Sequence, residues 1–302
     1  MRLDPYENGY NRGLIMTENK RRHGDRRDGV LLRDIDSMHY ITPYLYPNRA
    51  DNEAYISERI DLTAINEYLE KKNADSDTKW TLFHVVLAAV MKTVRLRPKL
   101  NRFIQGKRLY QRKELTAAFV VKKTFSDEAH EALAYLHFSP DDTINSIHER
   151  LMQEINSTRG ENIDNSTAGM DMMMRMPRFL CSFLMAIFRR MDYHGKMPAS
   201  LVATDPYYAT CMFSNLGSIK LRSGYHHLTN WGTNSLFIII GEKKTVPVFN
   251  ADGSFTMKET VDIGLTVDER IADGYYYSKS VALLKKLLSE PELLELPASQ
   301  EV

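Results

Sequence analysis

Residues 266–274 read Thr-Val-Asp-Glu-Arg-Ile-Ala-Asp-Gly. The run before them, 261–267, is apolar and β-branched and predicts a strand, whereas residues 275–288 have the apolar spacing of a helix. Charged side chains on a strand-to-helix turn need partners or water, and such turns commonly hold catalytic groups. This turn is therefore the first candidate site, and the rest of the chain is interpreted around it.

The residues before this turn predict a series of strands. Residues 210–217 read Thr-Cys-Met-Phe-Ser-Asn-Leu-Gly, and residues 235–241 are an apolar run typical of a buried strand. A hairpin is predicted around Asn250-Ala251-Asp252-Gly253. Further upstream the patterns predict strands at 55–60, 115–122 and 134–138, and helices at 62–72, 80–97 and 141–156.

The pattern Asp-x-Arg-x-x-Asp-Gly at 268–274, with Ser-Asn-Leu-Gly at 214–217, resembles the lipoamide acyltransferase catalytic domain and chloramphenicol acetyltransferase. The resemblance implies an α/β (α+β) two-layer sandwich in which helices cover a mixed β-sheet. It also implies a homotrimer whose active sites lie in channels between subunits, entered by CoA from one side and by the acyl acceptor from the other. No lipoyl-domain lysine motif is present, so we expect a stand-alone catalytic-domain homologue. Its expected parts are an arm at 1–50 that packs on the body or on a neighbouring subunit, one domain at 51–297, and a frayed tail at 298–302.

The resemblance also assigns roles to residues. Ser214 matches the family's oxyanion-stabilising hydroxyl, and Thr210 or Asn215 would supply that donor if the register differs. Arg270 and Asp273 match a structural pair that, with Asp268, holds the turn in shape. Gly274 is expected to allow a close backbone approach or a positive φ.

The family's general base is a histidine at the position that Glu269 occupies here. A thiol has a pKa near 8.5 and a free Glu carboxyl near 4.3, and this gap opposes full proton transfer by roughly 5–6 kcal/mol. Three interpretations follow. Glu269 is a base tuned by burial, His226 or His227 has become the base with Glu269 orienting it, or the site is inactive.

The function implied by the resemblance is CoA-dependent transfer of a small acyl group to a thiol, hydroxyl or amine of a small molecule or carrier. The alternative is an inactive homologue that serves as a trimeric acyl-CoA-binding scaffold. CoA or acyl-CoA is then a substrate, and no covalently bound cofactor is expected. No set of His, Cys, Asp and Glu has the spacing of metal ligands, so no metal is expected.

The composition restricts the class of partner. The 40 basic and 39 acidic residues nearly cancel, so the overall charge gives no reason to expect nucleic acid or an anionic membrane as a partner. The 2 cysteines do not form a disulfide framework and suit a reducing cytoplasm. The N-terminus lacks the apolar run of a signal peptide, and no apolar segment reaches the roughly 20 residues of a transmembrane helix.

One segment is unusual in composition. Residues 170–192 contain seven methionines among phenylalanine, leucine and isoleucine, and four arginines. Methionine adapts to varied apolar shapes, so this segment could form the wall of an acyl channel or a helix that touches a membrane. Packing in the core or between subunits is the interpretation that we favour for it.

Overall fold

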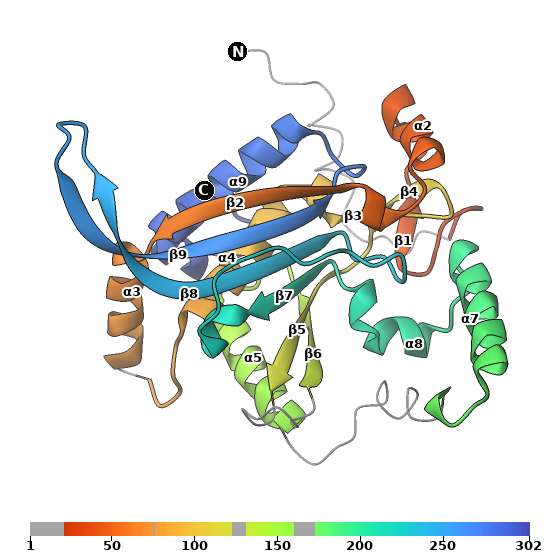
Figure 1. Cartoon of the computed structure of the whole chain (residues 1–302), viewed down its shortest axis with the longest axis horizontal. Helices are drawn as coiled ribbons and strands as arrows, with labels where there is room; N and C mark the ends of the chain where they lie inside the picture. Colours follow the sequence, from red (N-terminus) through yellow and green to blue (C-terminus); the bar gives the residue numbers. More distant parts are fainter. Residues whose placement is uncertain (1–20, 75, 123–130, 160–172) are drawn as a thin grey trace.

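The computed structural model describes residues 21–74, 76–122, 131–159 and 173–302. Helices pack on one face of a mixed sheet, as expected from the sequence (Figure 1). The strands are β1 (Gly29–Leu31), β2 (Glu53–Asp61), β3 (Arg102–Gln105), β4 (Arg108–Arg112), β5 (Leu115–Lys122), β6 (Glu131–Phe138), β7 (Cys211–Asn215), β8 (Leu236–Phe249) and β9 (Phe255–Asp268). The α-helices are α2 (Ser37–Leu45), α3 (Thr63–Ala74), α4 (Leu82–Leu96), α5 (Ile144–Arg159), α7 (Arg178–Tyr193), α8 (Ala199–Thr204) and α9 (Gly274–Ser289).

The main sheet has six strands in the order β2-β9-β8-β7-β5-β6. Strand β7 runs parallel to both β5 and β8, and the other neighbours are antiparallel. The predicted hairpin is confirmed, since β8 and β9 pair from Leu236 and Val267 out to Phe249 and Phe255. The two strands project beyond the rest of the sheet as a long arm (Figure 1).

The large core lies between the sheet and helices α3, α4, α5 and α9. Alternate side chains of a strand point to opposite faces, so Cys211 and Phe213 of β7 enter this core while Met212 points away from it. Helix α4 is apolar nearly all round and is almost completely buried, as expected for the central helix of a layer.

No helical layer from the described part of the chain covers the opposite face of the sheet, and a smaller apolar cluster covers part of it. The chain from 216 to 235 passes over this cluster, with Leu228 packed against Phe237 and Ile239 of β8. A second sheet of three strands, β1-β4-β3, was not predicted from the sequence.

Both ends of the described chain pack on the body. Arg26 is buried, and its guanidinium pairs with Asp28 at 2.8 Å and with Asp192 at 2.9 Å. The expectation of a frayed tail at 298–302 is wrong: Ala298 is buried, and its N–H donates to the Asp142 carbonyl at 2.8 Å. The buried Ala298 side chain and this backbone hydrogen bond hold the tail against the body of the protein.

Helix α7 differs from every helix of the core layer. It lies at one edge of the molecule, and Asp192, near its last turn, is its only buried residue among those described (Figure 1). Packing in the core, one half of the favoured expectation for segment 170–192, is therefore wrong within this chain for residues 173–192, and packing between subunits stays a prediction. Residues 170–172 lie outside the described residues.

Candidate active site

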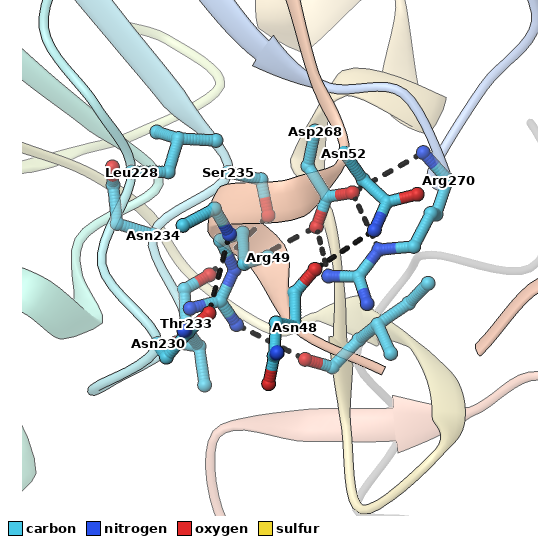
Figure 2. Close-up of polar contacts among 12 residues, drawn as sticks. Asn48, Arg49, Asn52, Leu228, Asn230, Thr233, Asn234, Ser235, Asp268 and Arg270 are labelled. Atoms are coloured by element: carbon cyan, nitrogen blue, oxygen red, sulfur yellow. Dashed lines mark hydrogen bonds and ion pairs between the residues drawn. The ribbon is translucent and has the colours of Figure 1, made fainter. Parts of the chain in front are cut away.

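The turn after β9 is built on a buried ion cluster. Asp268 is completely buried, and its two carboxylate oxygens each accept a hydrogen bond at 2.8 Å from the Arg270 guanidinium (Figure 2). Arg49 approaches the same carboxylate from the opposite side, with Nε 3.6 Å from Oδ2. Such a two-point arginine–carboxylate contact fixes geometry as well as charge. The motif's first Asp and its Arg therefore determine the shape of the turn.

Arg49 links this cluster to two other segments. Its Nη atoms donate to the Thr229 carbonyl at 2.6 Å and to the Ile104 carbonyl at 3.0 Å. Burial lowers the pKa of Arg49 to about 10, an effect that the Asp268 carboxylate opposes, so the guanidinium stays charged at neutral pH. Sequence reasoning missed Arg49, because nothing in Pro47-Asn48-Arg49 distinguishes it from a surface arginine.

The helix that follows is capped by the motif itself. Asp273 is the N-cap of α9 and accepts a hydrogen bond from the Tyr276 N–H at 2.8 Å. Arg270 thus bonds Asp268 while Asp273 bonds the Tyr276 N–H, so the two residues of the expected structural pair hold different parts of the turn. The expectation for Gly274 is also wrong, since its φ is not positive and no atom lies within 4 Å of a Cβ added there.

Glu269 is exposed, whereas the residues on either side of it, Asp268 and Arg270, are buried. The Glu269 N–H donates to the Asn52 carbonyl at 2.9 Å. Arg270 points away from it to Asp268. Within the described part of this one chain, no hydrogen bond or ion pair joins the Glu269 carboxylate to an imidazole or a guanidinium. In a single copy, therefore, Glu269 is neither a buried base nor a carboxylate that orients a histidine.

The two histidines lie on the helix-free face of the sheet. The His226 ring stacks on Phe237 with centroids 4.3 Å apart, and its Nδ1 lies 2.9 Å from the His227 carbonyl. A ring nitrogen facing a carbonyl donates its proton, which leaves Nε2 of the neutral ring as an acceptor. Both imidazoles are exposed, so His226 could accept a proton from a bound molecule.

Sequence reasoning missed Glu53, whose carboxylate holds residues 225–228, which we call the histidine segment. Glu53 begins β2, and its carboxylate accepts hydrogen bonds from the Leu228 N–H and from the Tyr55 hydroxyl, the latter at 2.5 Å. The Tyr55 ring also contacts Tyr225 at 5.0 Å. Strand β2 therefore positions the residues on both sides of the histidine pair.

Ser214 lies near the end of β7 and is half-buried, and Asn215 after it is exposed. By strand alternation the Ser214 side chain lies on the same face as Met212 and the histidine segment. Thr210 is not available as a donor, because it is buried and its hydroxyl donates to Asn101 Oδ1 at 2.8 Å. Ser214 and Asn215 remain the two candidate oxyanion donors.

A groove opens at this end of β7. It measures about 590 Å³, and we call it the β7 groove. Ligand pockets commonly measure between about 300 and 1,000 Å³. Its walls come from α3, from residues 79–83, from the start of the 3-10 turn after β7 and from the adjoining parts of β8 and β9; the polar lining includes Asn66, Lys79, Asn215, Ser218, Lys243 and Glu259.

Within one chain, Ser214 and Glu269 lie at opposite ends of the sheet. Ser214 is opposite Ile239, which is opposite Gly264, and Glu269 lies five residues beyond Gly264. At about 3.4 Å per residue and about 4.8 Å per strand, the Cα atoms of Ser214 and Glu269 are about 19 Å apart. Reacting groups need to approach within about 3–3.5 Å, so these two cannot serve one reacting carbonyl from the same copy.

Comparison with known families agrees with the motif and the fold. Residues 199–296 match the model of the 2-oxoacid dehydrogenases acyltransferase (catalytic domain). The chain resembles this acyltransferase domain. The matched residues contain both Ser214-Asn215-Leu216-Gly217 and the turn at 268–274. A search among curated proteins finds no match.

Solved structures show the same fold over most of the chain. A probable dihydrolipoamide acetyltransferase from Listeria monocytogenes is 13% identical, with a TM-score of 0.56 over 86% of this chain and 94% of its own. A chloramphenicol acetyltransferase is 11% identical, with a TM-score of 0.56 over 86% of this chain and 99% of its own. The truncated catalytic core of the 2-oxoacid dehydrogenase complex from Thermoplasma acidophilum is 14% identical, with a TM-score of 0.53 over the same shares. The acyltransferase-like fold expected from the motifs is confirmed.

Proposed function

We propose that this chain is a CoA-dependent acyltransferase whose active site is completed by two copies, one supplying Ser214 and the next supplying Glu269. The separation of about 19 Å within one chain carries this proposal, because an acyltransferase site needs a base and an oxyanion donor at one carbonyl. The acyltransferase-like fold and the match of both motifs to the family model support it. A closed ring of identical copies, such as a homotrimer, joins opposite ends of neighbouring chains.

The reaction uses two groups of the protein, a base and an oxyanion donor. Glu269 accepts the proton of the attacking hydroxyl, amine or thiol as its lone pair forms a bond to the thioester carbonyl carbon. The hydroxyl of Ser214 on the adjacent copy donates a hydrogen bond to the oxyanion that develops. Collapse of the tetrahedral intermediate breaks the carbon–sulfur bond, and the CoA sulfur leaves as the thiol with the proton that Glu269 accepted. The acyl group then belongs to the acceptor.

The β7 groove is the proposed site for acyl-CoA. It is large enough for an extended arm and reaches Asn215, the other candidate oxyanion donor, whereas the Ser214 side chain lies on the opposite face of the sheet. Lys79 and Lys243 are exposed on its lining and would face the phosphates, although Lys243 shares its charge with Glu259 at 3.4 Å. The acyl carbonyl would then lie at the end of β7, where the next copy presents Glu269.

A thiol-release assay with acetyl-CoA and a panel of hydroxyl, amine and thiol acceptors tests the proposal. Turnover by the native chain that is lost in Glu269→Gln, with the fold retained, supports it. The matched controls are His226→Ala and His227→Ala, which keep activity if Glu269 is the base. Loss in His226→Ala with retention in Glu269→Gln would assign the base to His226 instead.

The second candidate is a scaffold that binds acyl-CoA without turnover. One observation favours it: Glu269 is exposed, and within the described residues of one copy no imidazole or guanidinium bonds its carboxylate. CoA binding measured by thermal shift would then be unaffected by Glu269→Gln and weakened by Lys79→Glu. Absence of thiol release with every acceptor, together with CoA binding, would establish this alternative.

A further inference from the structure

Helix α7 presents apolar side chains to solvent on the side away from its buried residue. Phe179, Phe183 and Ile187 follow one another at intervals of four and form a single ridge. Phe179 is 77% exposed and Phe183 is 61% exposed, and Met174 just before the helix is 79% exposed. Large apolar side chains that cluster in this way mark an interaction surface.

The charges beside this ridge have one sign. Arg175, Arg178, Arg189 and Arg190 are all exposed. Arg178 and Arg189 are eleven residues apart, which is three helical turns, so they form one flank of the ridge. The only acid between 173 and 193 is Asp192, which is buried and paired with Arg26 at 2.9 Å. The exposed surface of α7 is thus both apolar and strongly positive.

A second apolar ridge lies at the same end of the molecule. Helix α2 lies near α7 at this end (Figure 1), and its residues Met38, Ile41 and Leu45 are exposed. The turn between β3 and β4 contacts both helices, since Lys107 lies over the Tyr44 ring and Gly106 lies against the Tyr193 carbonyl. Two apolar helices held by one turn give a broader surface than either alone.

We propose that this end of the molecule binds the surface of an anionic lipid bilayer, with α7 lying in the plane of the headgroups. A helix with an aromatic apolar ridge and arginines beside it is typical of this mode of binding. The acyl-chain boundary would take up Phe179 and Phe183, and anionic headgroups would pair with the four arginines. None of the helices in the described part of the chain has the length and apolar character needed to cross a bilayer, and binding in the plane of the surface needs no such helix.

The anchoring surface is separate from the proposed acyl-transfer site. Neither Glu269 nor Ser214 belongs to α7 or α2, and the β7 groove has no lining residue from either helix. Membrane binding therefore does not depend on acyl transfer, and either proposal can fail while the other stands.

Co-sedimentation of the full chain with extruded vesicles tests this proposal. We expect binding to equimolar phosphatidylcholine and phosphatidylserine, at least tenfold weaker binding to phosphatidylcholine alone, and a further loss as salt is raised. Phe179→Ser with Phe183→Ser should weaken binding by roughly tenfold or more, because two apolar side chains no longer enter the bilayer. Arg189→Glu with Arg190→Glu should weaken binding to the anionic vesicles by at least tenfold.

The matched control is Phe249→Ser at the tip of the β8–β9 arm. Phe249 is 74% exposed, a fraction close to those of Phe179 and Phe183, and it ends β8, whose arm projects at the other end of the molecule (Figure 1). It should leave vesicle binding unchanged. Equal binding to both vesicle types would overturn the proposal. So would a result in which Phe183→Ser changes the molecular mass in solution without vesicles, which would make α7 a contact between copies.

Discussion

The two ends of the sheet are stabilised by different means. At the end where β9 stops, Asp268, Arg270 and Arg49 form a buried charged cluster with several hydrogen bonds to the backbone. At the end where β7 stops, the chain approaches itself through glycines, and the rings of His84 and His148 pack on Trp80 in the wall of the β7 groove. The comparison shows that the motif's most recognisable residues build the turn, whereas Glu269 between them is exposed in the single chain.

The largest expected effect on stability comes from removing the carboxylate of Asp268, at the end of the sheet where β9 stops. Asp268→Ala leaves the guanidiniums of Arg49 and Arg270 buried without their carboxylate, and we expect a loss of about 3–5 kcal/mol in the free energy of unfolding. Chemical denaturation measures it. The matched control is Asp262→Ala on the same strand, whose partner Arg59 is exposed; it should be close to neutral. Similar losses in both variants would contradict a special role for the buried cluster.

The next effect concerns the glycine contacts of the second end. A Cβ on Gly264 would collide with the Gly224 carbonyl, so Gly264→Ala should force the 222–228 segment off the sheet and cost about 1–3 kcal/mol. Gly274→Ala is the control, because no atom lies within 4 Å of its added Cβ. Unfolding of the two variants by denaturant distinguishes them. A neutral Gly264→Ala would mean that the segment over the sheet is not closely packed.

The second end should also be sensitive to acid. Burial lowers the pKa of His84 to about 4, with His148 adding to the effect, whereas an unfolded histidine titrates near 6.5. Because the folded pKa is depressed, the neutral ring's stabilisation is complete above pH 6.5 and is lost as the pH falls toward 4. The contribution of His84 to the loss between pH 7 and pH 5 is about 2 kcal/mol. His84→Gln should flatten the pH dependence of the unfolding free energy by about this amount, and an unchanged slope would contradict the assignment.

The smallest effect is at the cap of α9. Asp273→Ala removes the acceptor of the Tyr276 N–H and should cost about 1 kcal/mol. Asp273→Asn is the control, since its side-chain oxygen still accepts that hydrogen bond. Thermal unfolding of both variants measures the difference. A loss as large as that of Asp268→Ala would place Asp273 in the buried cluster.

The fold could be predicted because its signals are local. Strand alternation, the helix-period stripe of α4 and the turn residues at 250–253 each specify an element without reference to the rest of the chain. The motif at 268–274 then identified the arrangement. The small sheet β1-β4-β3 was missed because its strands are short, and because β1 pairs with β4 across about 80 residues of sequence.

The site could be predicted only in part, because its contacts join distant residues. Arg49 and Glu53 are nearly 180 residues from the carbonyl of Thr229 and the N–H of Leu228 that they bind. The position of His148 between the apolar residues of α5 is typical of a solvent-facing side chain, yet His148 is buried against Trp80, with ring centroids 3.8 Å apart. Sequence spacing gave no sign of either arrangement.

The measurement that tests the two-copy site most directly is complementation between Ser214→Ala and Glu269→Gln. Each variant alone should be inactive in thiol release from acyl-CoA. Oligomers assembled from a mixture of the two should regain activity, because some interfaces then pair an intact Ser214 with an intact Glu269 of the neighbouring copy. Mixed oligomers that stay as inactive as their parents, while the native chain turns over, would contradict the account.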